Sequence, residues 1–449
     1  MESLRAGLSR RRFVVGSLSL PAAALTSGVL ADGAAARTAP AARLGRRDPS
    51  LQSWRAVRAQ FRLDPRLTHF ANFILASHPE PVRRSIARHR VALDADPYTY
   101  ESTSSFGREQ EVASAAAAYL GTDPDLIALT DSTTMGLGLV YRTLRLQAGD
   151  EVLTTEHDHY STHESLRLRA QADGVVVRKL RLYPPRTPEL ASVDGVVGAL
   201  RGAIAPATRL VGITWVHSSS GVKLPVRAIA DAIRAANASR PPERRIALVV
   251  DGVHALGAEA FRVEQLGCDV FVAGCHKWLW GPRGTGLVWA TPAAWERMSP
   301  IIPSFDPSVY GAWIGGVAPQ APPGPTMSPG GFHAFEHRWA LSAAFAFHEA
   351  IGPERIARRT LALSRRLREG IAAVPGLELR SPGGALGSGV VCLEVAGKTP
   401  GEVVGALRSR FGIVASVTPY AVQFVRVGTS CLNTRREIDR LVDSLAGLR

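Results

Sequence analysis

A carboxylate and a lysine each stand directly after an apolar run of the chain. Asp251 follows the run 247–250, and Lys277 follows the run 271–275 by way of His276. Runs that are apolar on both faces predict buried strands, so we expect both side chains near strand ends. A lysine amine in such a place can bond covalently to an aldehyde, and a buried carboxylate can keep a ring nitrogen protonated. The pair indicates covalent chemistry on an aromatic ring.

Pyridoxal 5'-phosphate (PLP) needs both groups, and the glycine-rich loop 281–286 follows the lysine. This pattern resembles the class V aminotransferase family over residues 65–445, with the isopenicillin N epimerase-like branch as the nearest in character. The resemblance implies an α/β fold of the aspartate aminotransferase type (PLP fold type I). It also implies Lys277 as the cofactor-bound lysine, Asp251 as the partner of the pyridine nitrogen, and a homodimer.

A second polar stretch, 131–136, follows the apolar run 126–129 and opens a helix. A helix N-terminus offers free backbone N–H groups and favours an anion. By the resemblance, Ser132, Thr133 and Thr134 form the phosphate-binding site together with His276. The two threonines could instead be ordinary helix caps. Relatives often carry a serine or an asparagine where Gly274 stands, so one side-chain phosphate contact is expected to be missing.

Histidines follow the next strand, in the stretch 156–163. The resemblance assigns His157 to stacking on the pyridine ring and to proton transfer at the substrate carbon, and it leaves His159 open for the same role. A cluster of His157, His159 and His163 could alternatively bind a metal in a hydrolase, but the spacing fits neither common zinc motif and leaves Asp251 and Lys277 unexplained. We expect no metal site.

Four further side chains complete the predicted site. Ser218 and His254 fall where relatives contact the phenolic oxygen of PLP, although short polar residues are also ordinary turn formers. Arg426 resembles the family arginine that binds the substrate α-carboxylate bidentately, and Asn72 is assigned to substrate binding. Leu432 replaces a tyrosine common in relatives, which puts the details of the substrate pocket in doubt.

The elements that must position these residues are alternating strands and helices. Apolar runs at 126–129, 151–153, 175–177, 210–213 and 247–250 are separated by helix-length segments, which predicts a mostly parallel sheet of the seven-stranded type. We expect an N-terminal segment at 37–107 that packs on the small domain, a PLP-binding large domain at 108–324, and a smaller α+β C-terminal domain at 325–449.

The first 36 residues have the pattern of a twin-arginine signal peptide. Arg10 and Arg11 precede a weakly apolar stretch and an Ala-x-Ala site at 34–36. The alternative is a basic N-terminus without such a role. We expect recognition by the twin-arginine translocase, export of the folded protein as in the pyoverdine-tailoring family member, and no stable membrane anchor.

The net charge of +14 is spread along the chain rather than clustered with aromatics, so no nucleic-acid partner is expected. The four cysteines show no C-x-x-C spacing, and no structural disulfide is expected.

The resemblance implies an enzyme that acts at the amino-bearing carbon of an amino acid, or of an amino-acid moiety in a larger metabolite. Epimerase, transaminase and oxidative tailoring chemistry all stay open. A C–S lyase or cysteine desulfurase-like enzyme is an alternative, but the stretch 415–421 before Arg426 lacks the cysteine that desulfurases need. A metal-dependent hydrolase and a non-catalytic PLP-fold binding protein are alternatives of other classes.

Overall fold

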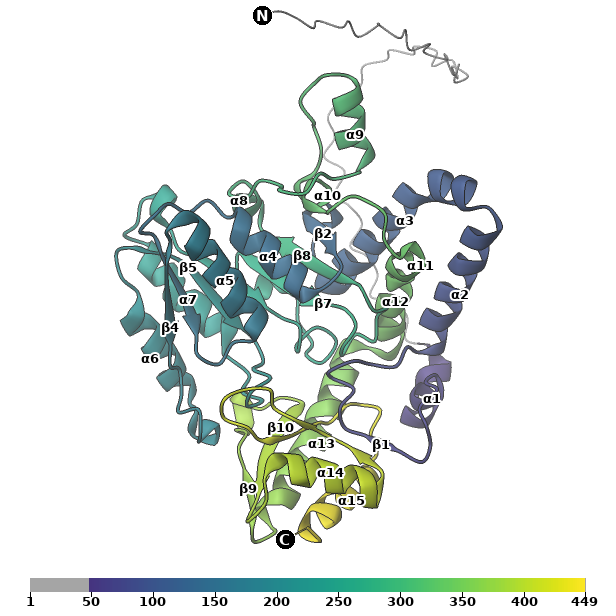
Figure 1. Cartoon of the computed structure of the whole chain (residues 1–449), viewed down its shortest axis with the longest axis vertical. Helices are drawn as coiled ribbons and strands as arrows, with labels where there is room; N and C mark the ends of the chain where they lie inside the picture. The colour runs from purple at the N-terminus through teal and green to yellow at the C-terminus, as the bar shows by residue number, and fades with distance from the viewer. Residues whose placement is uncertain (1–47, 449) are drawn as a thin grey trace, which may run out of the picture. The chain divides into compact units, whose positions relative to one another are not determined.

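A seven-stranded sheet forms the centre of the computed structural model, which describes residues 48–448 (Figure 1). The strand order is β2-β8-β7-β6-β5-β3-β4, and only β8 runs antiparallel to its neighbours. The strands are β2 (Ile127–Thr130), β3 (Glu151–Thr155), β4 (Val176–Leu180), β5 (Thr208–Thr214), β6 (Ala247–Asp251), β7 (Val270–Gly274) and β8 (Gly286–Ala290). The predicted mostly parallel α/β sheet is confirmed.

Helices cover both faces of this sheet because its strands are apolar on both faces. Along β6, Leu248 and Val250 face one hydrophobic core, whereas Val249 faces the other. The first core is covered by α3 (Pro97–Leu120), α6 (Val193–Ala203), α7 (Val226–Asn237) and α12 (Leu341–Ile351). The second is covered by α4 (Thr133–Thr143), α5 (Tyr160–Asp173) and α8 (Pro292–Trp295).

A second, antiparallel sheet of four strands lies in the C-terminal part of the chain, in the order β12-β13-β10-β9. Its strands are β9 (Leu377–Leu379), β10 (Val390–Val395), β12 (Ser416–Val417) and β13 (Val425–Gly428). Its helices are α13 (Pro353–Ala372), α14 (Pro400–Phe411) and α15 (Arg435–Ala446), which share a third core with it. The short strand β1 (Thr68–His69) pairs with β11 (Ile413–Val414), which ties the N-terminal segment to this part.

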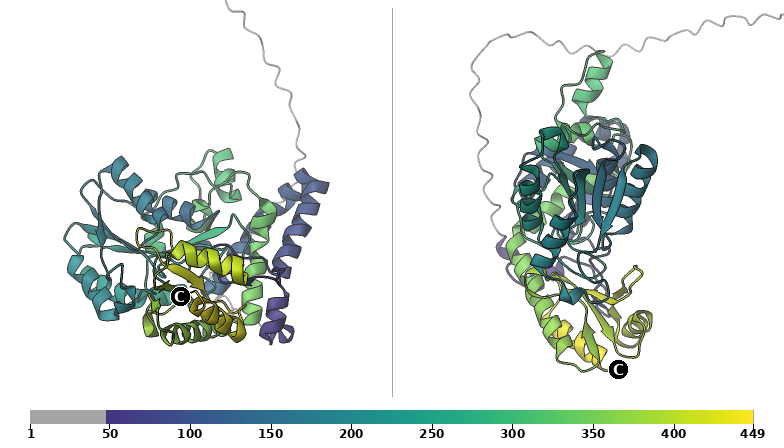
Figure 2. Two further views of the ribbon diagram at one scale, coloured as in Figure 1. Left: turned by 60° about the horizontal axis from the view of Figure 1, so that its bottom comes forward. Right: turned by 90° about the vertical axis from the view of Figure 1, so that its left-hand side faces the viewer.

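The remaining helices lie around the edges (Figures 1 and 2). They are α1 (Trp54–Ala59), α2 (Glu80–Ala95), α9 (Pro307–Ile314), α10 (Pro323–Met327) and α11 (Phe335–Trp339). Short 3-10 helices are η1 (Pro49–Leu51), η2 (Pro124–Leu126), η3 (Pro188–Leu190), η4 (Pro242–Arg244), η5 (Val263–Leu266) and η6 (Gly384–Leu386). Figure 1 shows α9 standing away from the sheet. The domain boundaries given above stay a prediction.

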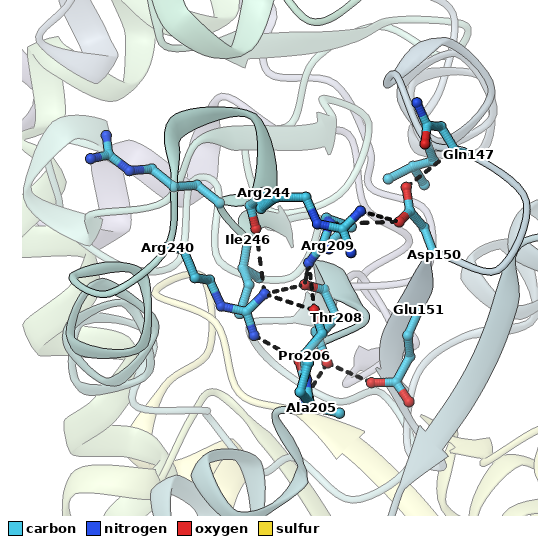
Figure 3. Close-up of polar contacts among 12 residues, drawn as sticks. Gln147, Asp150, Glu151, Ala205, Pro206, Thr208, Arg209, Arg240, Arg244 and Ile246 are labelled. Carbon is cyan, nitrogen blue, oxygen red and sulfur yellow. Dashed lines mark hydrogen bonds and ion pairs between the residues drawn. The ribbon is translucent and has the colours of Figure 1, made fainter.

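An arginine network closes the amino end of the sheet, opposite to the predicted site (Figure 3). Arg209 is buried and donates to the carbonyl of Thr208 at 2.7 Å, while its Nε lies 3.5 Å from Oδ1 of Asp150. Arg240 donates to the carbonyls of Thr208 at 2.8 Å and Ala205 at 2.6 Å. These bonds hold the loop that leads into β5, so the network has a structural role. The predicted site lies at the opposite edge of the sheet, at the carboxyl ends of the strands.

The predicted signal peptide lies outside the described residues. Within residues 48–448, no helix is long and apolar enough to cross a membrane. All four cysteines, Cys268, Cys275, Cys392 and Cys431, are free and buried.

Candidate active site

The predicted site residues converge at the carboxyl ends of the strands. Asp251 is the last residue of β6, and Lys277 lies three positions after the end of β7. Thr133 begins α4 directly after β2, and Ser218 lies in the loop that follows β5. In an open parallel sheet this edge is where ligands bind, because the loops there splay apart while the strands fix their bases.

Lys277 has an unusually acidic ammonium group. Its pKa is lowered to about 8, chiefly by burial and in part by the charge of Arg426, and the charge of Asp251 opposes this shift. Its Nζ lies 3.3 Å from Nε2 of His254. The indole of Trp278 donates to Nδ1 of His254 at 3.3 Å, so the hydrogen of the neutral imidazole belongs on Nε2. His254 can therefore donate to a neutral Lys277 amine, which is the nucleophilic form.

Asp251 is a buried carboxylate that has no hydrogen bond or ion pair with a cationic side chain of residues 48–448. It is 2% exposed and accepts the N–H of Val253 at 3.0 Å. Burial raises its pKa to about 6, the charge of Asp158 adds to the shift, and Lys277 opposes it. A protonated ring nitrogen beside it would stabilise the ionised form, which suits the role predicted for this residue.

The N-terminus of α4 forms the predicted phosphate-binding site. Ser132 caps this helix, because its Oγ accepts the N–H of Met135 at 3.1 Å. Thr133 Oγ1 accepts the N–H of Gly274 at 2.8 Å, and Thr134 is exposed. Both threonines thus lie at the helix N-terminus, where the resemblance puts them. The hydroxyl hydrogens of Ser132 and Thr133 stay available to an anion, since both oxygens act here as acceptors.

Gly274 stands where relatives often carry a serine, and the structure shows why a glycine suits this position. A Cβ at this position would lie 2.9 Å from Thr133 Oγ1 and 3.1 Å from Cε1 of His276. A side chain there would push apart the two residues predicted to contact the phosphate. The glycine therefore allows their close approach, and His276, half-buried with a pKa lowered to about 4 by burial, stays neutral.

The two candidate stacking histidines lie in different surroundings. His157 is buried, and its ring stacks on Tyr183 with centroids 3.7 Å apart and an angle of 9°. His159 caps α5, and its pKa is lowered by burial and by the charges of Lys277 and Arg426. The charge of Lys277 thus acts on His159. For His157, by contrast, burial and His217 lower the pKa to about 3.

The histidine cluster considered as a metal site is not assembled. His163 Nε2 lies 2.7 Å from the carbonyl of Thr155, whereas His157 packs on Tyr183 and His159 Nδ1 accepts the N–H of Ser161 at 3.2 Å. Among the described residues, no group of three or more His, Cys, Asp or Glu side chains is arranged to hold a metal ion.

Arg426 reaches the site from β13 of the small sheet. It is 6% exposed, its Nη1 donates to the carbonyl of Ser218 at 2.8 Å, and its Nε donates to Oγ of Ser416 at 3.1 Å. The guanidinium lies over the ring of Phe73, 4.9 Å from its centroid. Asn72, the other predicted substrate residue, directly precedes Phe73 and is half-buried.

Sequence reasoning missed three aromatic residues of the site. Phe73 packs between Arg426 and Trp278, with its ring 6.1 Å from the indole, and Trp278 fixes the tautomer of His254. Tyr420, in the hairpin that precedes β13, places its hydroxyl 2.5 Å from Oγ of Ser218. The proximity of Trp278 to the lysine was a usable signal. Nothing in the sequence pointed to Tyr420.

Solved structures of other proteins share this fold. The cystine C-S lyase C-DES, solved as a complex with its product cysteine persulfide, has a TM-score of 0.75 with 21% identity, covering 85% of this chain and 97% of that one. A cysteine desulfurase from Thermococcus onnurineus NA1 has a TM-score of 0.73 with 19% identity, covering 90% and 98%. At these identities the likeness shows the fold, which is PLP fold type I.

Sequence comparison defines the family. The model of the class V aminotransferases matches residues 102–441. Isopenicillin N epimerase from Streptomyces clavuligerus is 27% identical over 410 residues, covering 89% of this chain and 99% of the epimerase. A cysteine desulfurase from Serratia proteamaculans is 27% identical over 336 residues, covering 71% of this chain and 77% of the desulfurase. The chain belongs to the class V aminotransferase family, and it is a PLP-dependent enzyme.

The residues present fit this cofactor. Asp251 has the raised pKa of a buried carboxylate that gains from a cationic partner, and Lys277 has the lowered pKa of an amine suited to attack an aldehyde. The approach of Thr133 and His276 across Gly274 forms a cradle that a Cβ would fill. Together these features match a pyridine ring, an aldehyde and a phosphate.

Proposed function

We propose that this enzyme acts at the amino-bearing carbon of an amino acid, or of an amino-acid moiety in a larger metabolite. One observation carries the proposal: Arg426, the predicted carboxylate ligand, is buried and is held by the carbonyl of Ser218 in the loop after β5, at the edge of the sheet where Lys277 also lies. A guanidinium that binds a carboxylate and an amine that serves the cofactor thus share one buried space. An α-amino acid carries its carboxylate and its amino group on the same carbon, so one such space can recognise both.

PLP, when bound, supplies an electron sink for the charge that develops at this carbon. The residues of the chain do the rest. We assign Lys277 to covalent attachment and to moving the proton at the substrate carbon, Asp251 to the ring nitrogen, and Arg426 with Asn72 to the substrate. His254 donates toward the Lys277 amine.

The phosphate is assigned to the N-terminus of α4, through Ser132, Thr133 and Thr134, with His276 opposite. The position stacked on the pyridine ring is assigned to His159, because the charges of Lys277 and Arg426 act on this histidine and lower its pKa. His157 is the second choice for this position, since its ring already stacks on Tyr183. Ser218, predicted to contact the phenolic oxygen of PLP, pairs its hydroxyl with that of Tyr420 at 2.5 Å, so we assign it to holding Tyr420 instead.

The test is product profiling of the loaded enzyme with a panel of L- and D-amino acids and amino-acid-bearing metabolites, read by mass spectrometry and chiral chromatography. We expect turnover at the α-carbon, as inversion, amino transfer or oxidation, that is lost in Arg426→Ala. Turnover confined to amines without a carboxylate would contradict the proposal.

An epimerase-type or transaminase-type reaction is favoured over desulfuration. Burial raises the pKa of Cys392 and of Cys431 to about 12, and it raises the pKa values of Cys268 and Cys275 as well. A thiolate nucleophile is therefore disfavoured at every cysteine. We expect no persulfide on the protein and negligible sulfide release from free cysteine.

We further propose that the protein is exported through the twin-arginine route to the periplasm or outside the cell. The support is the order of Arg10-Arg11, apolar stretch and Ala-x-Ala site in the sequence, all of which lie outside the described residues.

A homodimer is also proposed. Its support is the set of large apolar side chains left exposed on and around α9, which would gain from burial: Phe305, Tyr310, Trp313, Ile314 and Val317. Light scattering should give about twice the chain mass, and Trp313→Asp should shift the protein toward monomer. A monomeric wild type would contradict this proposal.

A further inference from the structure

The Arg426 guanidinium cannot satisfy a bound carboxylate alone. Its Nη1 and Nε each donate one hydrogen bond within the protein, to Ser218 and to Ser416, and among the described residues its Nη2 donates none. A guanidinium that binds a carboxylate through two parallel hydrogen bonds uses two of the roughly four lone-pair sites on the carboxylate oxygens. In a buried site, the remaining sites need other donors, because an unpaired buried charge is costly.

Tyr420 lies where such a donor is needed. The hairpin between β12 and β13 carries it, and the charge of Arg426 acts on the phenol. This hairpin is braced from within, because the N–H of Thr418 donates to the carbonyl of Phe424 at 3.0 Å and the N–H of Phe424 donates to Thr418 Oγ1 at 2.9 Å. The hairpin that carries Tyr420 is therefore closed by bonds to Phe424, directly before the strand that carries Arg426.

The hydroxyl of Tyr420 is paired with that of Ser218 at 2.5 Å. One hydrogen bond between two hydroxyls uses only one of their two hydrogens, so the pair always keeps one hydrogen to donate elsewhere. Burial raises the pKa of Tyr420 to about 12, so its phenol keeps its proton at working pH and acts as a donor. Ser218 thus holds Arg426 through its carbonyl and Tyr420 through its hydroxyl.

We propose that Tyr420 is a specificity-determining residue that donates the second hydrogen bond to the substrate carboxylate bound at Arg426. Ser218 holds the phenol beside the guanidinium before the substrate arrives. The enzyme then favours substrates with a free α-carboxylate over amines of the same size that lack one. The inference rests on the proposed function, because it takes the carboxylate site at Arg426 as given.

Two reagents that react with lysine-bound PLP test it: aminooxyacetate, which carries a carboxylate, and O-methylhydroxylamine, which does not. The absorbance change of the cofactor gives the apparent affinity for each, independent of turnover. Wild type should prefer aminooxyacetate. Tyr420→Phe should lower this preference by about tenfold to a hundredfold, the range for a hydrogen bond to a charged group, with the response to O-methylhydroxylamine unchanged.

Three comparison variants make the result specific. Tyr98→Phe removes a phenol that is 81% exposed on α3 and should keep the wild-type preference. Arg426→Lys should lower the preference at least as much as Tyr420→Phe. Ser218→Ala should lower the preference less than Tyr420→Phe does, because it frees the Tyr420 phenol but keeps both the phenol and the carbonyl of residue 218.

Several results would overturn the inference. The first is a Tyr420→Phe variant that prefers aminooxyacetate as strongly as the wild type does. The second is a Tyr420→Phe variant that loses its response to both reagents equally, which would give Tyr420 a structural role. A loss in Ser218→Ala without one in Tyr420→Phe would assign the donor to Ser218. A wild type that responds to both reagents without preference would contradict the carboxylate site itself. A wild type that responds to neither would overturn the proposed function and this inference with it.

Discussion

At the scale of residues, the site is built on two ionisable groups whose pKa values are displaced toward each other. Burial lowers the pKa of Lys277 to about 8 and raises that of Asp251 to about 6. In water the same groups would differ by more than six pH units. Each shift disfavours the charged form, so the protein holds an amine ready for attack and a carboxylate that gains from a cationic partner.

Asp251→Asn should have opposite effects on the cofactor-free and the loaded protein. Since the folded-state pKa of Asp251 is raised, the free energy of unfolding of the cofactor-free wild type should fall as pH rises from 4 through about 6. The variant lacks this loss, so at pH 8 it should be more stable by about 1–3 kcal/mol. Turnover of the loaded enzyme should fall by several orders of magnitude, because the ring nitrogen loses its partner.

Denaturant unfolding at pH 4 and pH 8, with turnover measured beside it, checks both effects. Asp269→Asn is a suitable control, because burial raises the pKa of this carboxyl too but it lies at the other end of the sheet, where it accepts the N–H of Leu248. A loaded Asp251→Asn enzyme with a near-normal rate would remove Asp251 from the site.

At the scale of elements, the strands were predictable and the hairpin was not. The runs at 126–129, 210–213 and 247–250 are apolar on both faces, and they became β2, β5 and β6. By contrast, β12 is two half-buried residues long, and the contact between Tyr420 and Ser218 joins positions 202 residues apart. No local pattern records such a contact.

The choice between His157 and His159 had a similar cause. It depends on where α5 begins, and His159 caps this helix. Polar residues that can cap a helix occupy the whole stretch around it, so sequence patterns locate a helix start only to within a few residues. A shift of two positions would exchange the histidine on which the charge of Lys277 acts.

Gly274→Ala tests the contact between α4 and β7. The added Cβ would meet Thr133 Oγ1 at 2.9 Å, so we expect loss of the bond from the N–H of residue 274 to Thr133 and displacement of the phosphate-binding residues. PLP affinity should fall about tenfold, as for the loss of one hydrogen bond, with little change in the fold. Spectroscopic titration of the cofactor-free protein with PLP measures this.

Gly198→Ala is the matched control for this substitution. A Cβ at Gly198 in α6 would meet no atom within 4 Å, so PLP affinity should not change. Equal affinity in both variants would show that the approach of α4 to β7 is not needed for the cofactor.

At the scale of the whole molecule, two sheets share one site, since β13 carries Arg426 and the loop after β5 carries Ser218, its hydrogen-bond partner. A site formed from distant parts of the chain requires the fold to be complete before the cofactor binds. The twin-arginine pathway, which we propose for this protein, carries folded proteins. Loading of PLP before export is therefore the order that we expect.

Replacing Arg10 and Arg11 by lysines should retain the protein in the cytoplasm, folded and loaded, because this export route reads the arginine pair. Fractionation with an absorbance measurement of bound PLP checks both location and loading. Replacing Arg62 and Arg66 by lysines, two positions outside the predicted signal, should leave export unchanged. Continued export of the Arg10/Arg11 variant would contradict the predicted route.

The most direct test of the central claim is reduction of the purified enzyme with borohydride, followed by peptide mass mapping. Borohydride converts the bond between PLP and its lysine into a stable amine. The structure places Lys277 beside His254 and within the electrostatic reach of Asp251, so we expect the pyridoxyl label on Lys277 alone and none in Lys277→Ala. A label on Lys179, Lys223 or Lys398, or a protein that binds no PLP, would contradict the account.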